Sequence, residues 1–351
     1  MKYTASVIGC GFGGAMSLDA LVASDRFDLV AACDQSEEAR ATAGDRSPGI
    51  QTFASHAELF HASPADVVCV STWAPSHRGI AEEALSLDLS GILVEKPLAD
   101  TAADGGALLR AIRAEKLPVA VPHGLLVLDH TRQILDRVHG GEIGELKLVE
   151  IQCRGWDMIN AGIHWLNFFV ALTRREPVAH VIAQCDTSTR TYRDGMQVET
   201  FAVAYAETES GVRMVMNTGD EVNVNRDGKD TLFRILGTEG QIEFWAWESS
   251  YRIQNAEFPS GRLIEIDPDP RSIHQRHLEL LADQMDSGTP DYTIAESSLQ
   301  ALELVEGAYL SSRTRSVVTF PLGEFTAPDL QGWDPGQPYS GRGGGRDGKI
   351  L

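Results

Sequence analysis

The sequence predicts an α/β protein with a doubly wound parallel sheet at the amino terminus, followed by an α/β domain with a large, mostly antiparallel sheet. Two observations support this fold class. A glycine-rich turn directly follows the first apolar run, and strands that alternate with helices later give way to strands in direct succession. Because 351 residues exceed a typical single core, two domains are expected. We place them at residues 1–122 and 123–325, with a tail or arm at 326–351.

Short apolar runs alternate with helix-like segments in the amino-terminal third, which is typical of a parallel sheet with right-handed crossovers. The predicted strands are Thr4–Ile8, Asp28–Cys33, Ala65–Ser71, Gly91–Glu95 and Pro118–Pro122. Ligands bind outside the carboxyl ends of the strands in such sheets. Side chains that follow the predicted strands are therefore the first candidates for function.

The segment Gly9-Cys10-Gly11-Phe12-Gly13-Gly14 lies between the first predicted strand and a predicted helix. In this position Gly9 permits a tight turn, Gly11 lets the backbone approach a pyrophosphate, and Gly14 lets helix and strand pack closely. A glycine-rich turn without a ligand is the alternative. The context favours a dinucleotide-binding turn, with Gly9, Gly11, Phe12, Gly13 and Gly14 as cofactor contacts.

Asp34 closes the second predicted strand, 20 residues after Gly14. A carboxylate at this position would bond the adenosine ribose hydroxyls and would repel a 2′-phosphate. The next residues, Gln35–Glu38, offer no arginine to hold such a phosphate. The sequence therefore favours NAD over NADP, and a helix N-cap is the alternative role for Asp34.

The loop after the strand Ala65–Ser71 adds Ser71, Thr72, Trp73 and His77 to the candidate cofactor contacts. Trp73 could pack against the nicotinamide riboside, and ordinary loop packing is the alternative. Ser76 can cap the following helix, which would place His77 in the first helical turn.

Lys96 stands between Glu95 and Pro97, where the apolar run Gly91–Val94 ends. A lysine at a strand end is common, but Glu-Lys-Pro at this place is not, and Pro97 fixes the turn. Beside an oxidised nicotinamide, itself cationic, the Lys96 proton is easier to move, or the amine can donate to a substrate oxygen. We expect Lys96 to be catalytic and to contact cofactor and substrate, and we expect Glu95 to contact the cofactor and to orient Lys96.

Together these segments resemble the Gfo/Idh/MocA oxidoreductases, named for glucose-fructose oxidoreductase and inositol dehydrogenase, over about residues 1–322. The resemblance rests on Gly9–Gly14, Ala65–His77, Glu95–Pro97, Gly141–Gly144 and Leu236–Gly240. It implies an NAD-binding Rossmann domain and a second α/β domain. The open sheet of that domain carries the substrate on one face and often a subunit contact on the other, so we expect a homo-oligomer formed through this sheet.

The remaining chain is consistent with this family. Long runs with period-two alternation follow one another without helices between them, as in an antiparallel sheet. The expected strands are Glu145–Arg154, Val178–Thr189, Glu199–Ala206, Arg213–Thr218, Thr231–Leu236 and Gln241–Trp245, and the expected helices are Gln275–Ser287 and Ile294–Ser312. Residues 326–351 are rich in Gly and Pro and should be a free tail or an arm on a neighbour, with Trp333 and Tyr339 favouring the arm.

The family resemblance also implies a helix that presents an Asp-x-x-x-His pair to the nicotinamide, and the matching run here is Asn160–His164. The spacing puts both side chains on one helical face, and His164 is the candidate general base. A histidine packed on an apolar helix is the alternative. The Asn160 amide can bond the imidazole or a substrate hydroxyl, but it cannot stabilise an imidazolium by charge, so Lys96 should share more of the proton transfer. In a regular helix Asp157 would lie about 10 Å along the axis from His164 and should not substitute for the missing carboxylate.

A second departure from the family lies at Leu126, where many relatives carry a substrate-facing arginine. His123 remains a possible substrate contact in this segment. Lys96, His123, Asn160 and His164 are therefore the expected substrate-binding residues.

Composition excludes several partners. The formal net charge of -20, without a dense Lys/Arg run, argues against nucleic acid and anionic membranes. No apolar stretch is long enough to span a bilayer, and Met1–Ile8 runs straight into the glycine turn without a signal peptide, so a cytoplasmic protein is expected. The five scattered cysteines suit buried, reduced thiols. His274 and His277 lack an obvious third ligand, and we expect no metal.

We expect an NAD-dependent dehydrogenase that oxidises a secondary hydroxyl of a sugar, cyclitol or related polyol, or reduces the corresponding ketone. Because Asn160 weakens proton removal, a redox-neutral enzyme with tightly bound NAD is the alternative: an isomerase, an epimerase, or an enzyme that cleaves a glycosidic bond through a transient ketone. A cofactor-binding sensor without turnover is a third possibility, and the presence of both Lys96 and His164 argues against it.

Overall fold

The computed structural model describes residues 2–224, 227–323, 334–339 and 349–350. The chain forms two compact units: unit 1 consists of Met1–Gly124 and Pro270–Leu299, and unit 2 consists of Leu125–Asp269 and Gln300–Leu351. The boundary expected near residue 122 lies close to the end of the first segment. The return of Pro270–Leu299 to unit 1 was not expected from the sequence.

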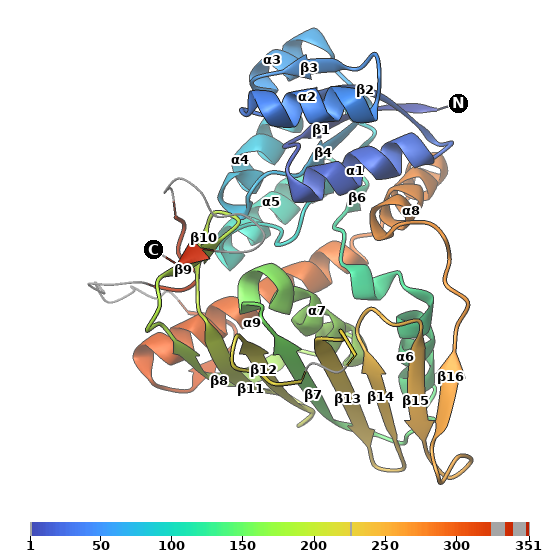
Figure 1. The fold of residues 1–351 in the computed structure, drawn as a ribbon, viewed down its shortest axis with the longest axis vertical. Helices are drawn as coiled ribbons and strands as arrows, with labels where there is room; N and C mark the ends of the chain where they lie inside the picture. Colours follow the sequence, from blue (N-terminus) through green and yellow to red (C-terminus); the bar gives the residue numbers. More distant parts are fainter. Residues whose placement is uncertain (1, 225–226, 324–333, 340–348, 351) are drawn as a thin grey trace. The chain divides into compact units, whose positions relative to one another are not determined.

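Unit 1 contains a parallel sheet in the order β3-β2-β1-β4-β5-β6, which in the described residues is the doubly wound arrangement predicted (Figure 1). Its strands are β1 (Tyr3–Ile8), β2 (Phe27–Cys33), β3 (Gln51–Phe53), β4 (Val67–Val70), β5 (Gly91–Val94) and β6 (Val119–Ala120). The strands β4 and β5 are buried along their whole length, which explains why they read as continuous apolar runs. The short strand β3 was not predicted.

Helices cover both faces of this sheet. They are α1 (Phe12–Ala23), α2 (Glu37–Arg46), α3 (His56–Ala62), α4 (Ala74–Ala84), α5 (Ala102–Ala114) and α8 (Ile273–Ser287). Although α8 is remote in sequence, it lies beside α1 and against β5 and β6 (Figure 1). Leu278, Leu281 and Ala282 of α8 join the core that contains Val7 and Leu93. Without α8, this face of the sheet would lose much of its apolar cover.

Unit 2 is organised around a mixed sheet in the order β16-β15-β14-β13-β7-β12-β11-β8-β17. Among these strands β7 and β12 are parallel and the other neighbours are antiparallel, which confirms a large, mostly antiparallel sheet. The strands are β7 (Leu146–Arg154), β8 (Val178–Asp186), β11 (Phe201–Thr208), β12 (Arg213–Gly219), β13 (Thr231–Gly237), β14 (Gln241–Trp245), β15 (Ser250–Gln254), β16 (Arg262–Glu265) and β17 (Val318–Thr319). The strands β15, β16 and β17 extend the sheet beyond the prediction.

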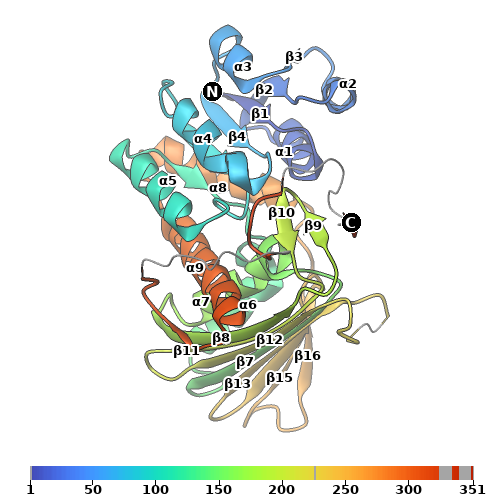
Figure 2. The ribbon, with the colours of Figure 1, turned by 90° about the vertical axis from the view of Figure 1, so that its left-hand side faces the viewer.

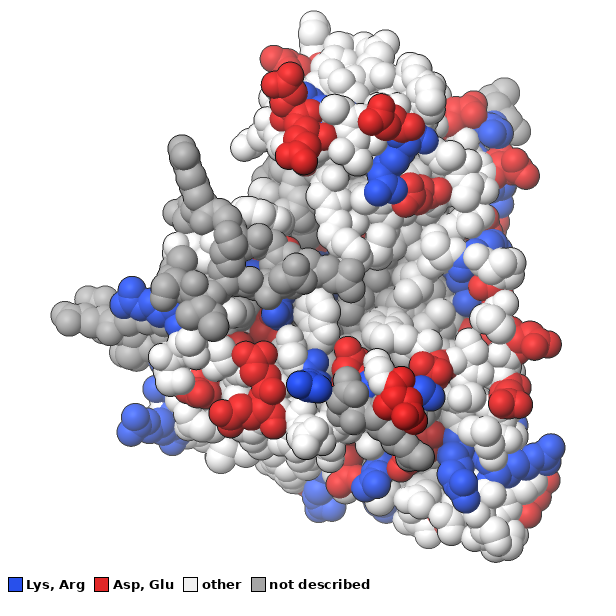
Figure 3. Space-filling view, in the orientation of Figure 1, with Lys and Arg blue, Asp and Glu red and all other residues white. Residues whose placement is uncertain are grey.

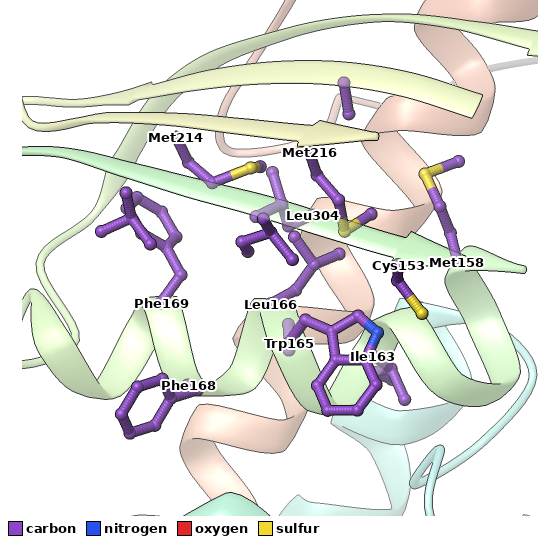
Figure 4. Packing of buried hydrophobic residues seen from close by; sticks show 14 of the residues in the cluster. Cys153, Met158, Ile163, Trp165, Leu166, Phe168, Phe169, Met214, Met216 and Leu304 are labelled. Atoms are coloured by element: carbon purple, nitrogen blue, oxygen red, sulfur yellow. The ribbon is translucent and has the colours of Figure 1, made fainter. Parts of the chain in front are cut away.

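One face of this sheet is covered by α6 (Asp129–His139), α7 (Ile163–Leu172) and α9 (Thr293–Thr314), of which α9 begins in unit 1 (Figure 2). Met214 and Met216 point from β12 toward α7, where Trp165 and Leu166 lie (Figure 4). The alternating burial along β11 and β12 produces this one-sided core. On the opposite face, Ile182 is 47% exposed.

A small sheet of β9 (Thr191–Arg193), β10 (Met196–Val198) and β18 (Lys349–Ile350) belongs to unit 2. The described segment Asp334–Tyr339 lies on this β9–β10 hairpin of its own chain, because the backbones of Gln197 and Gln337 hydrogen-bond and the rings of Tyr192 and Tyr339 are in contact. Trp333 and most of the expected tail lie outside the described residues.

Charged side chains lie at the surface (Figure 3), and the cysteine thiols lie in the interior. Acidic and basic side chains are interspersed on the face shown in Figure 3. None of the helices in the described ranges is long and apolar enough to cross a membrane. The five cysteines are free and buried, as expected.

Candidate active site

The glycine turn has the geometry that a dinucleotide requires. Gly9 has φ +89°, and a Cβ there would lie 2.6 Å from the Ser71 carbonyl oxygen. A Cβ on Gly14 would lie 1.8 Å from the carbonyl oxygen of Gly9, whereas a Cβ on Gly11 would meet nothing within 4 Å. Gly9 and Gly14 therefore allow close packing, and Gly11 borders open space.

The open space lies at the amino terminus of α1. The N-cap residue Gly11 provides no side chain to cap the helix, and the first turn holds no acidic residue. A helix amino terminus of this kind attracts an anion such as a pyrophosphate. Phe12, in the first turn, is 55% exposed.

Asp34 connects the glycine turn to the end of β2. Its Oδ2 accepts a hydrogen bond from the Cys10 N–H (2.7 Å), and its Oδ1 accepts one from the Ser36 N–H (2.8 Å). Ser36 caps α2, so the alternative role of Asp34 as an N-cap is wrong. Sequence reasoning overlooked Arg40, whose guanidinium donates to the Asp34 carbonyl oxygen at 2.7 Å.

The loop after β4 differs from the expectation in one respect. Trp73, not Ser76, is the N-cap of α4, and the Ser76 hydroxyl donates to Thr72 Oγ1 at 2.8 Å. Ser71 lies against the glycine turn, with its hydroxyl 3.2 Å from that of Ser17. Trp73 is 49% exposed, and its contact with the cofactor stays a prediction.

His77 lies in the first turn of α4, as predicted, but both ring nitrogens face backbone oxygens. Nδ1 is 2.8 Å from the Pro97 carbonyl oxygen and Nε2 is 2.8 Å from that of Thr72. Burial lowers the pKa of His77, although these two contacts oppose the shift. The imidazole therefore joins the loop after β4 to the Glu-Lys-Pro turn.

Glu95 is buried beside Lys96 and is held from two sides. Its Oε1 accepts a hydrogen bond from His274 Nε2 at 2.5 Å, and its Oε2 accepts one from the Lys96 N–H at 3.2 Å. Burial alone would raise the pKa of Glu95, but the charge and hydrogen bond of His274, followed by Lys96, lower it to about 2. A Cβ on Gly13 would lie 3.2 Å from Glu95 Cδ, so the Glu-Lys-Pro turn is in contact with the glycine turn.

His123 lies in the interior of unit 1. Its Nε2 is 2.8 Å from Ser298 Oγ, and its carbonyl oxygen accepts a hydrogen bond from His277 Nε2 at 3.2 Å. Burial and the neighbouring His277 lower the pKa of His123 to about 3, and burial lowers that of His277 to about 4. Both imidazoles are therefore neutral at pH 7. Contact between His123 and a substrate stays a prediction.

In unit 2, the segment before α7 is not the regular helix that was expected. Met158–Gly162 forms a π-helical turn, with the Gly162 N–H donating to the Asp157 carbonyl oxygen. Asn160 belongs to this turn and His164 to the first turn of α7. The expected face shared by Asn160 and His164 assumed regular α-helical geometry, so the spacing argument does not apply as stated.

His164 is half-buried beside two indole rings. Its ring centroid lies 6.0 Å from that of Trp165 and 6.1 Å from that of Trp247, which meets it edge to face. Trp165 is buried, but Trp247, between β14 and β15, is 47% exposed. Sequence reasoning missed Trp247 because a single tryptophan after a strand carries no motif.

Asp157 contacts Asn160 directly. It is the N-cap of the π-helical turn, and its Oδ1 accepts hydrogen bonds from the Asn160 N–H (2.7 Å) and Nδ2 (3.1 Å). Its Oδ2 pairs with Arg193. The expectation that Asp157 does not substitute for the missing carboxylate beside His164 stays a prediction.

A second buried carboxylate lies next to this turn. Glu199 Oε1 accepts a hydrogen bond from the Met158 N–H at 2.7 Å, and Oε2 accepts one from the Tyr309 hydroxyl at 2.7 Å. Burial and the charge of Asp157 raise the pKa of Glu199 to about 8, although the Tyr309 bond opposes this. Glu199 is therefore largely protonated at pH 7.

Family models match segments in both units of the chain. The family described as "Oxidoreductase family, NAD-binding Rossmann fold" matches residues 4–123, and the GFO/IDH/MocA carboxyl-terminal domain matches residues 155–243. The chain belongs to the Gfo/Idh/MocA oxidoreductase family. The predicted family, fold class, NAD cofactor and dehydrogenase type of enzyme are thereby confirmed.

Three relatives with known names are distantly similar to this chain. A D-apiose dehydrogenase from Paraburkholderia graminis is 24% identical over 93% of this chain and 92% of the relative. An Agrobacterium radiobacter oxidoreductase, solved with NAD+, L-tartaric acid and magnesium, has a TM-score of 0.77 and 20% identity over 91% of this chain and 98% of that chain. A levoglucosan dehydrogenase solved with NADH and levoglucosan has a TM-score of 0.78 and 15% identity, covering 92% and 100% of the two chains.

The residues of unit 1 fit the NAD of this family. The cradle at Gly9 and Gly14, the open space at Gly11 and the carboxylate of Asp34 match its pyrophosphate and ribose. No group of three or more His, Cys, Asp or Glu suited to a metal ion occurs within the part of the chain that the structure describes.

Proposed function

We propose that this family member is an NAD-dependent dehydrogenase that oxidises a secondary hydroxyl of a sugar or related polyol, or reduces the corresponding ketone. The observation that carries the proposal is the contact between Gly13 of the glycine turn and Glu95, the neighbour of Lys96. This contact lies within unit 1 and joins the residue that precedes Lys96 to the glycine turn. A lysine that acted only as a surface charge would not need a buried carboxylate next to it.

The chain's residues would hold NAD as follows. The amino terminus of α1 at Gly11 would bind the pyrophosphate, and Asp34 would bind the adenosine ribose hydroxyls. The exposed rings of Phe12 and Trp73 offer apolar surface to the cofactor. Bound NAD supplies the hydride acceptor. A clear kinetic preference for NADP would refute the role of Asp34.

This proposal assigns the proton transfer to His164 and Lys96. His164 takes the hydroxyl proton as general base, and Lys96 donates a hydrogen bond to the same oxygen. Asn160 contributes an amide that contacts the reacting groups. Trp247, exposed beside His164, offers an apolar wall for the C–H face of a sugar ring.

The proposed substrate class is supported by the exposed ring of Trp247 and by the names of similar proteins. The names of two of them, a D-apiose dehydrogenase and a levoglucosan dehydrogenase, refer to sugars or anhydrosugars. The redox-neutral alternative rests on Asn160, since an amide does not stabilise a protonated His164 by charge. An isomerase or epimerase would form product without net reduction of NAD.

One assay separates these functions. The purified protein is incubated with NAD and a panel of sugars and polyols, and reduced nicotinamide is followed by absorbance while products are analysed separately. Continuous formation of reduced nicotinamide supports the dehydrogenase, and product without added cofactor supports the redox-neutral enzyme. Binding of NAD without any product would refute both.

The variant Lys96→Ala tests the role of the amine. We expect turnover to be lost while NAD affinity is retained, and the exposed Lys2→Ala variant should behave like the wild type. Unchanged turnover in Lys96→Ala would remove this residue from the mechanism.

We also propose that the protein is a cytoplasmic homo-oligomer that associates through the sheet of unit 2. The open face of this sheet exposes Ile182 and Val203, which are 47% and 39% exposed. The buried thiols suit a reducing compartment. Light scattering on the wild type and on Val203→Glu tests the assembly, and a monomeric wild type would refute it.

A further inference from the structure

The side chain of Asn160 is surrounded by a buried polar network in unit 2. Asp157 is 1% exposed and Asn160 is 4% exposed, and the guanidinium of Arg193 is buried next to them. Polar groups this deeply buried are costly unless they are paired in a defined geometry. The pairing therefore determines how the Asn160 amide can be oriented.

Only one orientation of the Asn160 amide satisfies these neighbours. Its Nδ2 lies 3.1 Å from Asp157 Oδ1 and 3.4 Å from the Arg193 carbonyl oxygen, and both of these atoms are acceptors. An amide nitrogen has two hydrogens, so each acceptor receives one. The flipped amide would bring its oxygen against a carboxylate and a carbonyl. The Asn160 oxygen is therefore directed away from both acceptors.

Asp157 is itself held in place by a buried ion pair. Its Oδ2 pairs with Arg193, and the Arg193 guanidinium carbon lies 4.7 Å from the centroid of the Trp156 ring. Its Oδ1 also accepts the Asn160 backbone N–H, as an N-cap does. The carboxylate thus fixes both the backbone and the side chain of Asn160.

We propose that Asp157 is a positioning residue that orients the Asn160 amide with its oxygen as a hydrogen-bond acceptor for the reacting groups. The turn then offers an acceptor at position 160 while its negative charge resides at Asp157. This inference rests on the proposed function, in which Asn160 and His164 act on the substrate. In this inference Asp157 orients the Asn160 amide, and Arg193, at the end of β9, holds Asp157 in place.

The variant Asn160→Asp distinguishes this inference from the family pattern, in which an aspartate at this position would be harmless. Here the new carboxylate would replace the Nδ2 group that lies 3.1 Å from Asp157 Oδ1, and two carboxylates at this distance repel each other. We expect kcat at pH 7.5 to fall at least about tenfold, as when partners of active-site groups are removed. We also expect the melting temperature of the variant to fall, relative to the wild type, as pH rises from 5.5 to 8.

The double variant Asp157→Asn with Asn160→Asp exchanges the two groups and provides the rescue. The new amide at position 157 can donate to the new carboxylate at position 160, so part of the lost kcat should return and the pH-dependent fall in melting temperature should disappear. Asp157→Asn alone should lower kcat more than it changes the affinity for NAD. Asp186→Asn, which alters a carboxylate bound to Ser188, is the matched control and should resemble the wild type.

The outcomes separate the inference from the proposed function. A wild type that is inactive on the sugar and polyol panel would refute the proposed function and, with it, the positioning role. An active wild type whose kcat and pH-dependent melting are unchanged in Asn160→Asp would overturn the positioning role alone. Failure of the double variant to recover either property relative to Asn160→Asp would also overturn it.

Discussion

Replacing Glu199 by glutamine should remove a pH-dependent loss of stability from unit 2. Glu199 is buried, and its carboxyl oxygens accept hydrogen bonds from the Met158 N–H and the Tyr309 hydroxyl. Because burial and the charge of Asp157 raise its pKa to about 8, the folded protein holds this carboxyl in its neutral form at pH 6. Glutamine closely mimics the neutral carboxyl in shape and can keep the bond from the Met158 N–H.

The size and sign of the effect follow from the two pKa values. In the unfolded chain the Glu199 carboxyl has its ordinary value of 4.5, so between pH 4.5 and 8 the folded state binds the extra proton. Stability from this group is therefore complete below pH 4.5 and is lost as pH rises through 8. At about 1.4 kcal/mol per unit of pKa, the total is about 5 kcal/mol, of which about 3 kcal/mol is lost between pH 5.5 and 7.5.

The measurement is denaturant unfolding of the wild type and of Glu199→Gln at pH 5.5, 6.5 and 7.5. The free energy of unfolding of the wild type should decline relative to that of the variant across this series, by up to about 3 kcal/mol. Glu265→Gln, at an exposed position on the edge strand β16, is the control and should parallel the wild type. A difference between wild type and Glu199→Gln that stays constant with pH would refute the reasoning.

Substitutions at four other positions test the site more locally. Gly14→Ala should disrupt the turn, because its Cβ would lie 1.8 Å from the carbonyl oxygen of Gly9. Gly11→Ala should fold normally, as judged by circular dichroism, but should bind NAD at least about tenfold more weakly in calorimetry. An NAD affinity equal to that of the wild type would contradict this prediction. Trp247→Ala should raise KM for the sugar about threefold to tenfold, and Trp247→Phe should have an intermediate KM. An unchanged KM in Trp247→Ala would exclude a contact between this ring and the sugar. Glu95→Gln should lower the free energy of unfolding by about 3 kcal/mol at pH 7, because the pKa of Glu95 is lowered to about 2 in the folded protein. This loss should become smaller as pH falls from 5 to 3. A loss that does not change with pH would show that the pairing with His274 does not stabilise the charged carboxylate.

The amino-terminal half of the site could be predicted because its chemistry is encoded locally. The spacing from Gly9 to Gly14 specifies a turn whose atoms lie within a few residues of one another, and Asp34 follows at the end of the next strand. Steric restrictions on φ and on the approach of Cβ atoms act over the same short range. The structure therefore contains this turn as the sequence predicted it.

The supporting contacts could not be predicted because they join segments that are distant in sequence. Glu95 and His274 are separated by 179 residues, and nothing in either segment indicates the other. Asp157 and Asn160 are close in sequence, but they lie at a π-helical turn where a regular helix was expected. Burial of Arg193 and Glu199 beside that turn depends on the β9–β10 hairpin, which was not predicted at all.

The helix α8 has a consequence for how the polypeptide matures. Since α8 belongs to unit 1 but follows the strands β7 to β16, the segment Leu125–Asp269 of unit 2 is synthesised before unit 1 receives α8. Met285 of α8 lies where a Cβ on Gly91 would be only 2.9 Å from its sulfur, so the helix docks tightly on a sheet synthesised long before. A chimera that exchanges unit 1 between relatives must therefore transplant two pieces of sequence, and a fragment that stops at residue 124 should leave an apolar face available for aggregation.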